Sequence, residues 1–271
     1  MIKPFHEIIE LDNCINKEMK AAYQYLPLLL RRKSISKTAE LFFMHIVSTD
    51  AIKHSLFSAA ESKNIYTVKI LFRSLVEHFL RFQYIWFQYI RIDDGEPFSK
   101  SYYIKLGLSE KLSNINSTLA RNRISNVKGK TREEMWSEAQ SLDPRFATYS
   151  IQEIEKFSRE ISIKNIITAL SKEIEKKSDE SCNLLKDLIS RYATLSSFVH
   201  GGLHAHHNLI GYEKSGKLDN DLCVICGVTL QITSMIKTQS LVVLFKEKHE
   251  LGSILRAIQV LTEQIVSKPK S

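Results

Sequence analysis

Apolar residues recur along most of this chain at intervals of three and four, the spacing that places them on one face of an α-helix. The pattern is clearest at Ile154, Phe157 and Ile161, because the positions between them are charged or polar. We predict a bundle of about eight helices, the first of them kinked or ended by Pro27. The main predicted ranges are 4–32, 36–62, 64–92, 99–120, 151–177, 179–200, 222–248 and 251–266.

Turn-forming residues separate the bundle from a predicted helical excursion at about 93–150. An Asp-Asp-Gly-Glu-Pro run at 93–97 ends the third helix. Thr131 and Glu134 have the spacing of a capping box, which predicts a further short helix. The segments 121–132 and 203–217 are predicted to be loops. We therefore expect one helical domain over 1–271, in which 93–150 is a candidate inserted subdomain.

The composition favours an all-α fold, because turn-rich β architectures need glycine and proline at their corners. The chain has only nine Gly and five Pro among 271 residues. Aromatic residues occupy nearly all azimuths of the third helix between Phe79 and Tyr89, which is typical of a central, mostly buried helix. A ladder of aromatics for stacking nucleobases is the alternative interpretation, and we favour core packing.

The formal charge of +8 and the isoelectric point of about 9.2 are compatible with a polyanionic partner. We expect a cytoplasmic protein with reduced cysteines, because the N-terminus shows no apolar signal region and the cysteines lie in apolar or amphipathic stretches. The best candidate for a membrane span, 222–244, contains Lys237 and two glutamines, so we expect no membrane partner. The cysteines are Cys14, Cys182, Cys223 and Cys226.

A polar stripe runs along the otherwise apolar third helix. Its members follow each other at spacings of four, four, three and four, so they share one side of the helix. The stripe either faces solvent or lines a polar cleft, and burial would require each charge to meet its opposite. Its residues are Arg73, Glu77, Arg81, Tyr84 and Gln88.

A second group of candidate site residues ends the helix predicted at 179–200. Tyr192, Ser196 and His200 lie four residues apart and therefore share one face. His200 stands at the C-terminal end of this helix, before two glycines, where a ligand has access to it. Because histidine titrates near neutrality, it suits acid–base chemistry. The alternative is that His200 only caps the last carbonyls of its own helix.

Metal and cofactor chemistry finds little support in the sequence. Four histidines lie within 200–207, yet their spacing fits no metal-site template and no carboxylate or cysteine completes a set. Cys223 and Cys226 have the spacing of a redox or zinc half-site, but they lie in an apolar stretch that favours core packing. Glycine-rich phosphate loops, dinucleotide fingerprints and nucleophile elbows are absent from the sequence. We predict neither a metal nor a cofactor.

The predicted loop at 121–132 is rich in basic residues. It holds five basic residues and no acidic one, which suits contacts to phosphates without sequence choice. A solvated loop without a ligand is the alternative. The candidate nucleic-acid-binding residues are Arg121, Arg123, Lys128, Lys130 and Arg132.

Two of these segments together carry a resemblance. The run Arg73-Ser-Leu-Val-Glu77 and the run Leu195-Ser-Ser-Phe-Val-His200-Gly201 resemble elements of a group of bacterial helical proteins. That group is similar in turn to the HEPN superfamily (higher eukaryotes and prokaryotes nucleotide-binding). The resemblance implies a HEPN-like helical core and a metal-independent RNase of a toxin or anti-phage defence system, often dimeric.

In this resemblance His200 matches the histidine of the superfamily motif, whereas Ala193, Thr194 and Leu195 stand where the motif has its arginine. Our hypothesis is that Arg73 supplies the missing cation and that Glu77 orients it or His200. Catalysis then requires Arg73, Glu77 and His200 to converge, with Tyr192 and Ser196 holding the phosphate or the His.

Three functions therefore remain open at this point. The first is a defence or toxin protein with RNase activity that acts on RNA and works as a homo-oligomer or with a partner protein. The second is a helical binding or regulatory subunit without catalysis. The third is a nucleotide or small-molecule sensor that uses a polar cleft.

Overall fold

The computed structural model describes residues 3–91, 95–176, 183–245 and 249–266, and within them every regular element is helical. This confirms the all-α class, but the described residues form twelve α-helices and one short 3₁₀ helix rather than about eight helices. The helices are α1 (Phe5–Tyr23), α2 (Leu26–Arg31), α3 (Ser36–Glu61), α4 (Ile65–Arg91), α5 (Glu96–Ile124), α6 (Arg132–Leu142), η1 (Pro144–Phe146), α7 (Ile151–Glu160), α8 (Ile163–Glu175), α9 (Asn183–Val199), α10 (Leu203–Ser215), α11 (Leu218–Phe245) and α12 (Leu251–Val266).

Three of the four additional helices arise at breaks or loops, and the fourth, α6, is the short helix that the capping box predicted. Pro27 lies in the first turn of α2, so the predicted first helix is two helices. Ser162 accepts a hydrogen bond from the backbone N–H of Asn165 and thereby begins α8, which divides the predicted helix 151–177. The segment 203–217 was predicted to be a loop, and this prediction was wrong because α10 occupies most of it.

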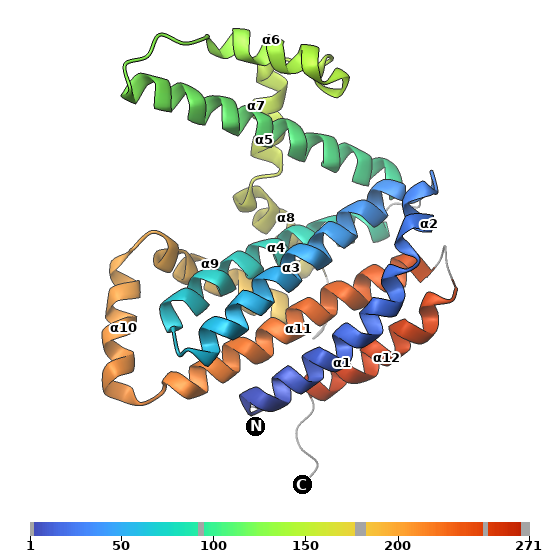
Figure 1. Ribbon diagram of the computed structural model, residues 1–271, viewed down its shortest axis with the longest axis vertical. Coiled ribbons are helices and arrows are strands. Elements are labelled where there is room, and N and C mark those ends of the chain that lie inside the picture. Colours follow the sequence, from blue (N-terminus) through green and yellow to red (C-terminus); the bar gives the residue numbers. More distant parts are fainter. Residues whose placement is uncertain (1–2, 92–94, 177–182, 246–248, 267–271) are drawn as a thin grey trace.

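Helix α4 is the centre of the main bundle, as its aromatic composition predicted. It packs on α3, α8, α9 and α11, and Figure 1 shows these helices gathered around it. Phe79 and Phe82 are completely buried, and the ring of Phe82 lies 5.3 Å from that of Phe42 on α3. The aromatic residues of α4 therefore pack in the core, where their large apolar surfaces stabilise the bundle.

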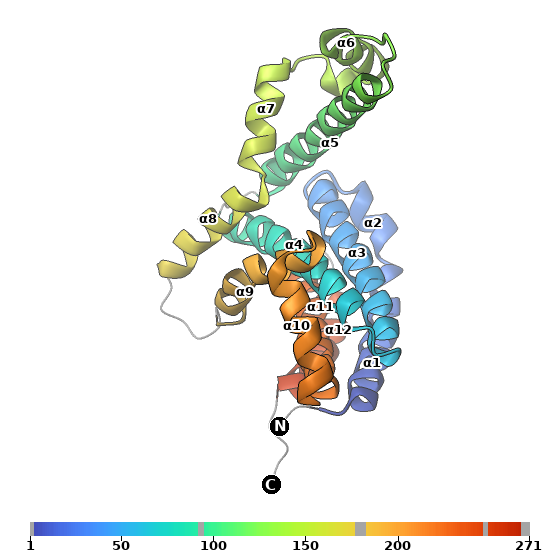
Figure 2. The ribbon, with the colours of Figure 1, turned by 90° about the vertical axis from the view of Figure 1, so that its left-hand side faces the viewer.

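A helical arm, which we define as residues 96–160, projects from the bundle (Figures 1 and 2). It consists of α5, α6, η1 and α7 and has a small core of its own, separate from that of the bundle. Capping boxes begin α6 at Thr131 and α7 at Ser150, so the capping box predicted at Thr131 is confirmed. Because Ile154 belongs to the core of the arm, the excursion continues beyond the predicted end at 150.

The base of the arm is fastened to the start of α3 by Glu96. Its carboxylate accepts hydrogen bonds from the backbone N–H groups of Lys37 and Thr38, each at 2.9 Å, and from the Thr38 hydroxyl at 2.8 Å. These N–H groups lack partners within their own helix, so Glu96 acts as a cap supplied from a distant part of the chain. Glu96 is only 3% exposed, which leaves the cap protected from water.

Four charged side chains meet inside the bundle, between α1, α3 and α11. Lys53 lies 2.5 Å from Asp12 and 2.9 Å from Asp50, and Lys237 lies 2.8 Å from Asp50. Asn16 accepts a hydrogen bond from Lys237 at 2.9 Å and donates one to Asp12 at 3.2 Å. Two carboxylates and two ammonium groups leave this buried ion cluster neutral. Burial nevertheless lowers the pKa of Lys237 to about 8, with a further contribution from the charge of Lys53.

Helix α11 contains Lys237 and is, in the described part of the chain, the one helix that is long and apolar enough to cross a membrane. Half of its most apolar stretch is buried inside the structure. It packs on α1, α3, α4 and α12, the position of a core helix.

Candidate functional site

The polar stripe of α4 forms a ladder of ion pairs. Glu77 lies 2.5 Å from Arg73 and 2.9 Å from Arg81, so one carboxylate is shared by two guanidinium groups. All three side chains are about one-fifth to one-quarter exposed. Burial raises the pKa of Glu77, but the hydrogen bonds and charges of the two arginines outweigh it and hold that pKa below its usual value. The ladder therefore carries a net charge of +1.

Tyr192 of α9 joins this ladder. Its hydroxyl accepts a hydrogen bond from Arg73 and donates one to Glu77 at 3.1 Å. Burial and the charge of Glu77 raise the pKa of Tyr192 to about 12, so the phenol stays protonated near neutral pH. Three of the predicted site residues, Arg73, Glu77 and Tyr192, are thus in direct contact.

The other two predicted site residues lie away from this contact. The Ser196 hydroxyl donates a hydrogen bond to the Tyr192 backbone carbonyl at 3.0 Å, which ties it to its own helix. His200 is exposed and, within the described residues, its ring has no hydrogen-bonding or ionic partner. Helices α4 and α9 are antiparallel, since Arg73 meets Tyr192 while Tyr66 donates to the Phe198 carbonyl. His200 therefore lies beyond the level of Tyr66, which is itself about 10 Å along α4 from Arg73.

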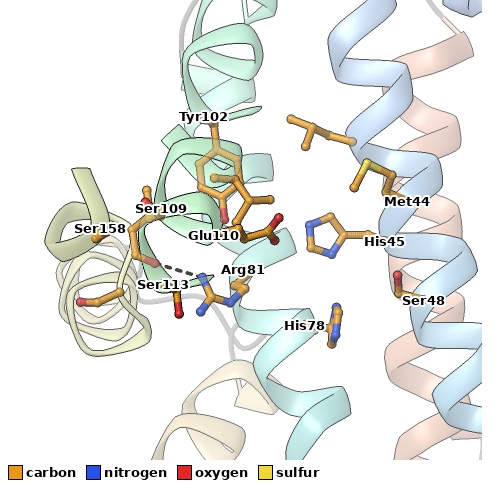
Figure 3. A pocket seen from close by; sticks show the side chains of 14 residues that line it. Met44, His45, Ser48, His78, Arg81, Tyr102, Ser109, Glu110, Ser113 and Ser158 are labelled. Carbon is orange, nitrogen blue, oxygen red and sulfur yellow. Dashed lines mark hydrogen bonds between the residues drawn. The ribbon is translucent and has the colours of Figure 1, made fainter. Parts of the chain in front are cut away.

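A pocket of about 540 Å³ opens on the other side of the ladder, where the base of the arm meets the bundle. Figure 3 shows His45 pointing from α3 towards Tyr102 and Glu110 of α5, with Arg81 and His78 of α4 below them. Residues of α3, α4, α5, α7 and the turn before α8 form the walls of this pocket. The lining residues are Leu41, Met44, His45, Ser48, His78, Arg81, Tyr102, Leu106, Ser109, Glu110, Ser113, Ser158, Ile161 and Ser162.

Arg81 links the bundle to the arm at the floor of this pocket. It donates to Glu77 within α4 and to the Ile161 backbone carbonyl, at 3.0 Å, where α7 ends. Its hydrogen bond with Tyr102 brings in α5 as well. Because one guanidinium spans three elements, the shape of the pocket depends on this side chain.

The two histidines of the pocket are neutral at physiological pH. Burial lowers the pKa of His45 to about 3, with smaller contributions from His78 and Arg81. Burial also lowers the pKa of His78, although the charge of Glu77 opposes the shift. The His45 Nδ1 atom and the Ser109 hydroxyl oxygen are buried and have no hydrogen-bond partner in the part of the chain that the structure describes. A buried polar atom in this state gains free energy when a ligand supplies the missing bond.

The basic residues predicted to bind nucleic acid lie around the turn between α5 and α6. Arg121 and Arg123 belong to the last turn of α5 and not to a loop. Lys130 and Arg132 are paired with Glu138 and Glu155, at 2.7 Å and 2.6 Å. Within the described residues Arg121, Arg123 and Lys128 are exposed and form no ion pair.

The candidate metal ligands do not gather into a site. Among the described residues, no three side chains of His, Cys, Asp or Glu lie close enough together to hold a metal ion. Cys226 is buried, and burial raises the pKa of its thiol to about 12, an environment that keeps a thiol unreactive. Cys182 lies outside the described residues.

The chain matches no protein-family model, no curated protein and no solved structure. The sequence did not predict this pocket, and His45 was not among the predicted site residues. One signal was available, since His78 directly follows Glu77 in the polar stripe and Arg81 belongs to it. The contribution of α5 depends on how the arm folds back, which the spacing of residues does not encode.

Proposed function

We propose that this protein is a helical sensor that binds a small, largely apolar molecule in the pocket between the arm and the bundle. The observation that carries the proposal is a cavity of about 540 Å³ into which the His45 side chain points, and whose lining includes a buried His45 Nδ1 without a hydrogen-bond partner among the described residues. Cavities of a few hundred Å³ with apolar walls and a few converging polar groups are the usual form of small-molecule sites.

The chemistry of the walls defines the class of ligand. Leu41, Leu106 and Ile161 supply apolar surface, while neutral His45 and the Ser109 hydroxyl supply hydrogen bonds. Arg81 adds positive charge that Glu77 only partly neutralises, because Glu77 also forms an ion pair with Arg73. These features favour an aromatic or aliphatic body with one polar, neutral or anionic head group.

A bound molecule in this pocket would touch both the bundle and the arm, and this geometry is the reason for proposing a sensor. A ligand that binds one arrangement of the arm more tightly than another increases the fraction of molecules in the arrangement that it prefers. Regulatory or partner-binding activity of the arm then depends on occupancy of the pocket.

The test uses 8-anilinonaphthalene-1-sulfonate, an aromatic sulfonate whose fluorescence rises in apolar sites. We expect saturable binding by the native protein and at least a tenfold weaker affinity in a Ser109→Phe variant, because the added ring fills the pocket. Ser101→Phe places the same ring on the solvent side of α5 and serves as the control. Equal binding by all three proteins would rule out the pocket as the site.

The second proposal is that the protein is an RNase of a bacterial defence or toxin system, with His200 as the acid–base residue. What favours it is the exposure of His200 at the end of α9, where a polymer has access. The Arg73–Glu77–Tyr192 contact lies away from His200, so this proposal no longer assigns a catalytic role to Arg73 or Glu77. In this proposal the protein acts as a homo-oligomer or with a partner protein. Incubation with total RNA tests it: cleavage by the native protein should be lost in His200→Ala. Absence of cleavage by the native protein would exclude it.

A further inference from the structure

The turn at the far end of the arm has a defined geometry. Helix α5 ends in a Schellman motif, in which Val127 N–H donates to the Asn122 carbonyl at 2.9 Å and Asn126 N–H donates to the Arg123 carbonyl at 3.2 Å. Asn126 adopts the left-handed conformation that this motif requires, with φ of 50°. We call residues 121–130 the arm tip. Figure 1 shows it at the end of the arm, away from the bundle.

Two aliphatic side chains are presented to solvent at the arm tip. Ile124 is 87% exposed, and Val127 is 58% exposed. Ile124 is the last residue of α5, Val127 directly follows the left-handed Asn126, and neither belongs to the core of the arm. Single exposed aliphatic residues are common on protein surfaces, but two in a projecting turn amid positive charge form a distinct surface.

Positive charge surrounds these side chains. Arg121 and Arg123 precede Ile124, and Lys128 follows Val127, and these three basic residues are exposed and form no ion pair within the described residues. Glu138 pairs with Lys130. The arm tip thus combines exposed apolar side chains with three free cations beside them.

We propose that the arm tip docks onto an anionic lipid bilayer, with Ile124 and Val127 entering the interface and the three free cations meeting lipid phosphates. A bilayer satisfies both features at once, since apolar residues gain from the acyl boundary and basic residues gain about 1 kcal/mol each from anionic headgroups. The inference goes beyond the proposed pocket. It replaces the expectation that the chain has no membrane partner with a peripheral contact, not a membrane span.

The observations favour lipid over RNA as the occupant. Single-stranded RNA is bound by stacking bases on aromatic side chains, and 121–130 contains no aromatic residue. The phosphates of an RNA would pair with the three cations, but the RNA would leave Ile124 and Val127 exposed to water. A protruding turn also fits a flat surface, since the remaining part of the arm holds the bundle away from it (Figure 2).

Co-sedimentation with vesicles tests the proposal on the full chain. One set of vesicles contains phosphatidylcholine alone, and the other contains phosphatidylcholine and phosphatidylglycerol in equal parts. We expect binding to the anionic vesicles, a loss of about fivefold for each of Arg121→Gln, Arg123→Gln and Lys128→Gln, and a loss of about tenfold in Ile124→Ser/Val127→Ser. Circular dichroism checks that every variant remains folded.

Leu142→Ser and Lys156→Gln provide matched controls, because both residues are exposed and lie in the arm outside its tip. They should bind vesicles as the native protein does. Equal binding to both kinds of vesicle, or equal losses in the controls, would overturn the proposal. So would binding of single-stranded RNA that needs the three cations and is unchanged in Ile124→Ser/Val127→Ser, because nucleic acid would then be the occupant.

Discussion

Replacing Asp50 by Asn removes one of the two negative charges from the buried ion cluster. Asp50 lies within 2.9 Å of Lys53 and 2.8 Å of Lys237, so the change withdraws a carboxylate from two ammonium groups. Lys53 keeps Asp12, whereas Lys237 keeps, among the described residues, the hydrogen bond to the Asn16 side-chain carbonyl and the more distant charge of Asp12. The cluster then carries an uncompensated positive charge at a position where Lys237 is 1% exposed.

Breaking a buried pair in this way costs about 3–5 kcal/mol. We expect a value near the lower end, because Lys237 can release its proton. Its pKa is already about 8, so deprotonation at pH 7 costs only about 1.4 kcal/mol in the native protein, and less once Asp50 is neutral. The double variant Asp50→Asn/Lys237→Met is neutral again, so it should recover most of the lost free energy of unfolding.

Urea unfolding followed by circular dichroism measures these differences. Asp219→Asn is the matched control, since it makes the same change in an exposed ion pair with Lys63 and should cost less than about 0.5 kcal/mol. If Asp50→Asn cost no more than Asp219→Asn, or if the double variant were no more stable than Asp50→Asn, the reasoning on buried charge would be refuted.

Three further predictions concern single residues. Because the pKa of His45 is about 3 in the folded protein, the unfolded chain binds an additional proton between pH 3 and about 6.5, so the free energy of unfolding should fall as pH drops through this window. Denaturation at pH 7 and pH 5 should show a smaller fall in His45→Leu. Thr131→Ala should destabilise the arm by about 1 kcal/mol, seen as faster hydrogen exchange in α6 with unchanged exchange in α4. Tyr192→Phe should lower the free energy of unfolding by about 1–3 kcal/mol, since it removes the hydroxyl between Arg73 and Glu77, and an unchanged value would show that this contact is not formed in solution.

The sequence predicts long helices best, because a long segment makes the helical spacing of its apolar residues readable. Helices α3, α4 and α12 agree with their predicted ranges to within one or two residues. Helix α10 escaped prediction because Leu203 and Ile210 are exposed, so its apolar residues follow no inward-facing pattern. The break before α8 was hidden because Ile161 continues the apolar spacing across it.

The ladder on α4 is readable from sequence, because residues four apart on a helix are neighbours. The position of His200 relative to Arg73 cannot be read from the sequence, because it depends on how far α9 is shifted along α4. The Tyr66–Phe198 hydrogen bond and the Arg73–Tyr192 contact set this register. Charged residues on apolar faces, such as Asp12, are visible in the sequence. The partners of these charged residues cannot be read from the sequence, because the partners belong to helices that are distant along the chain.

The cap that Glu96 provides for α3 has a consequence for the order of folding. During synthesis the first turn of α3 has no partner for its N–H groups until residue 96 has been added, 58 residues after Thr38. The nascent chain can form α1 to α4 earlier, but the start of α3 should fray until the arm begins. Completion of an early helix therefore waits for a later one, which couples the assembly of the bundle to the arrival of the arm.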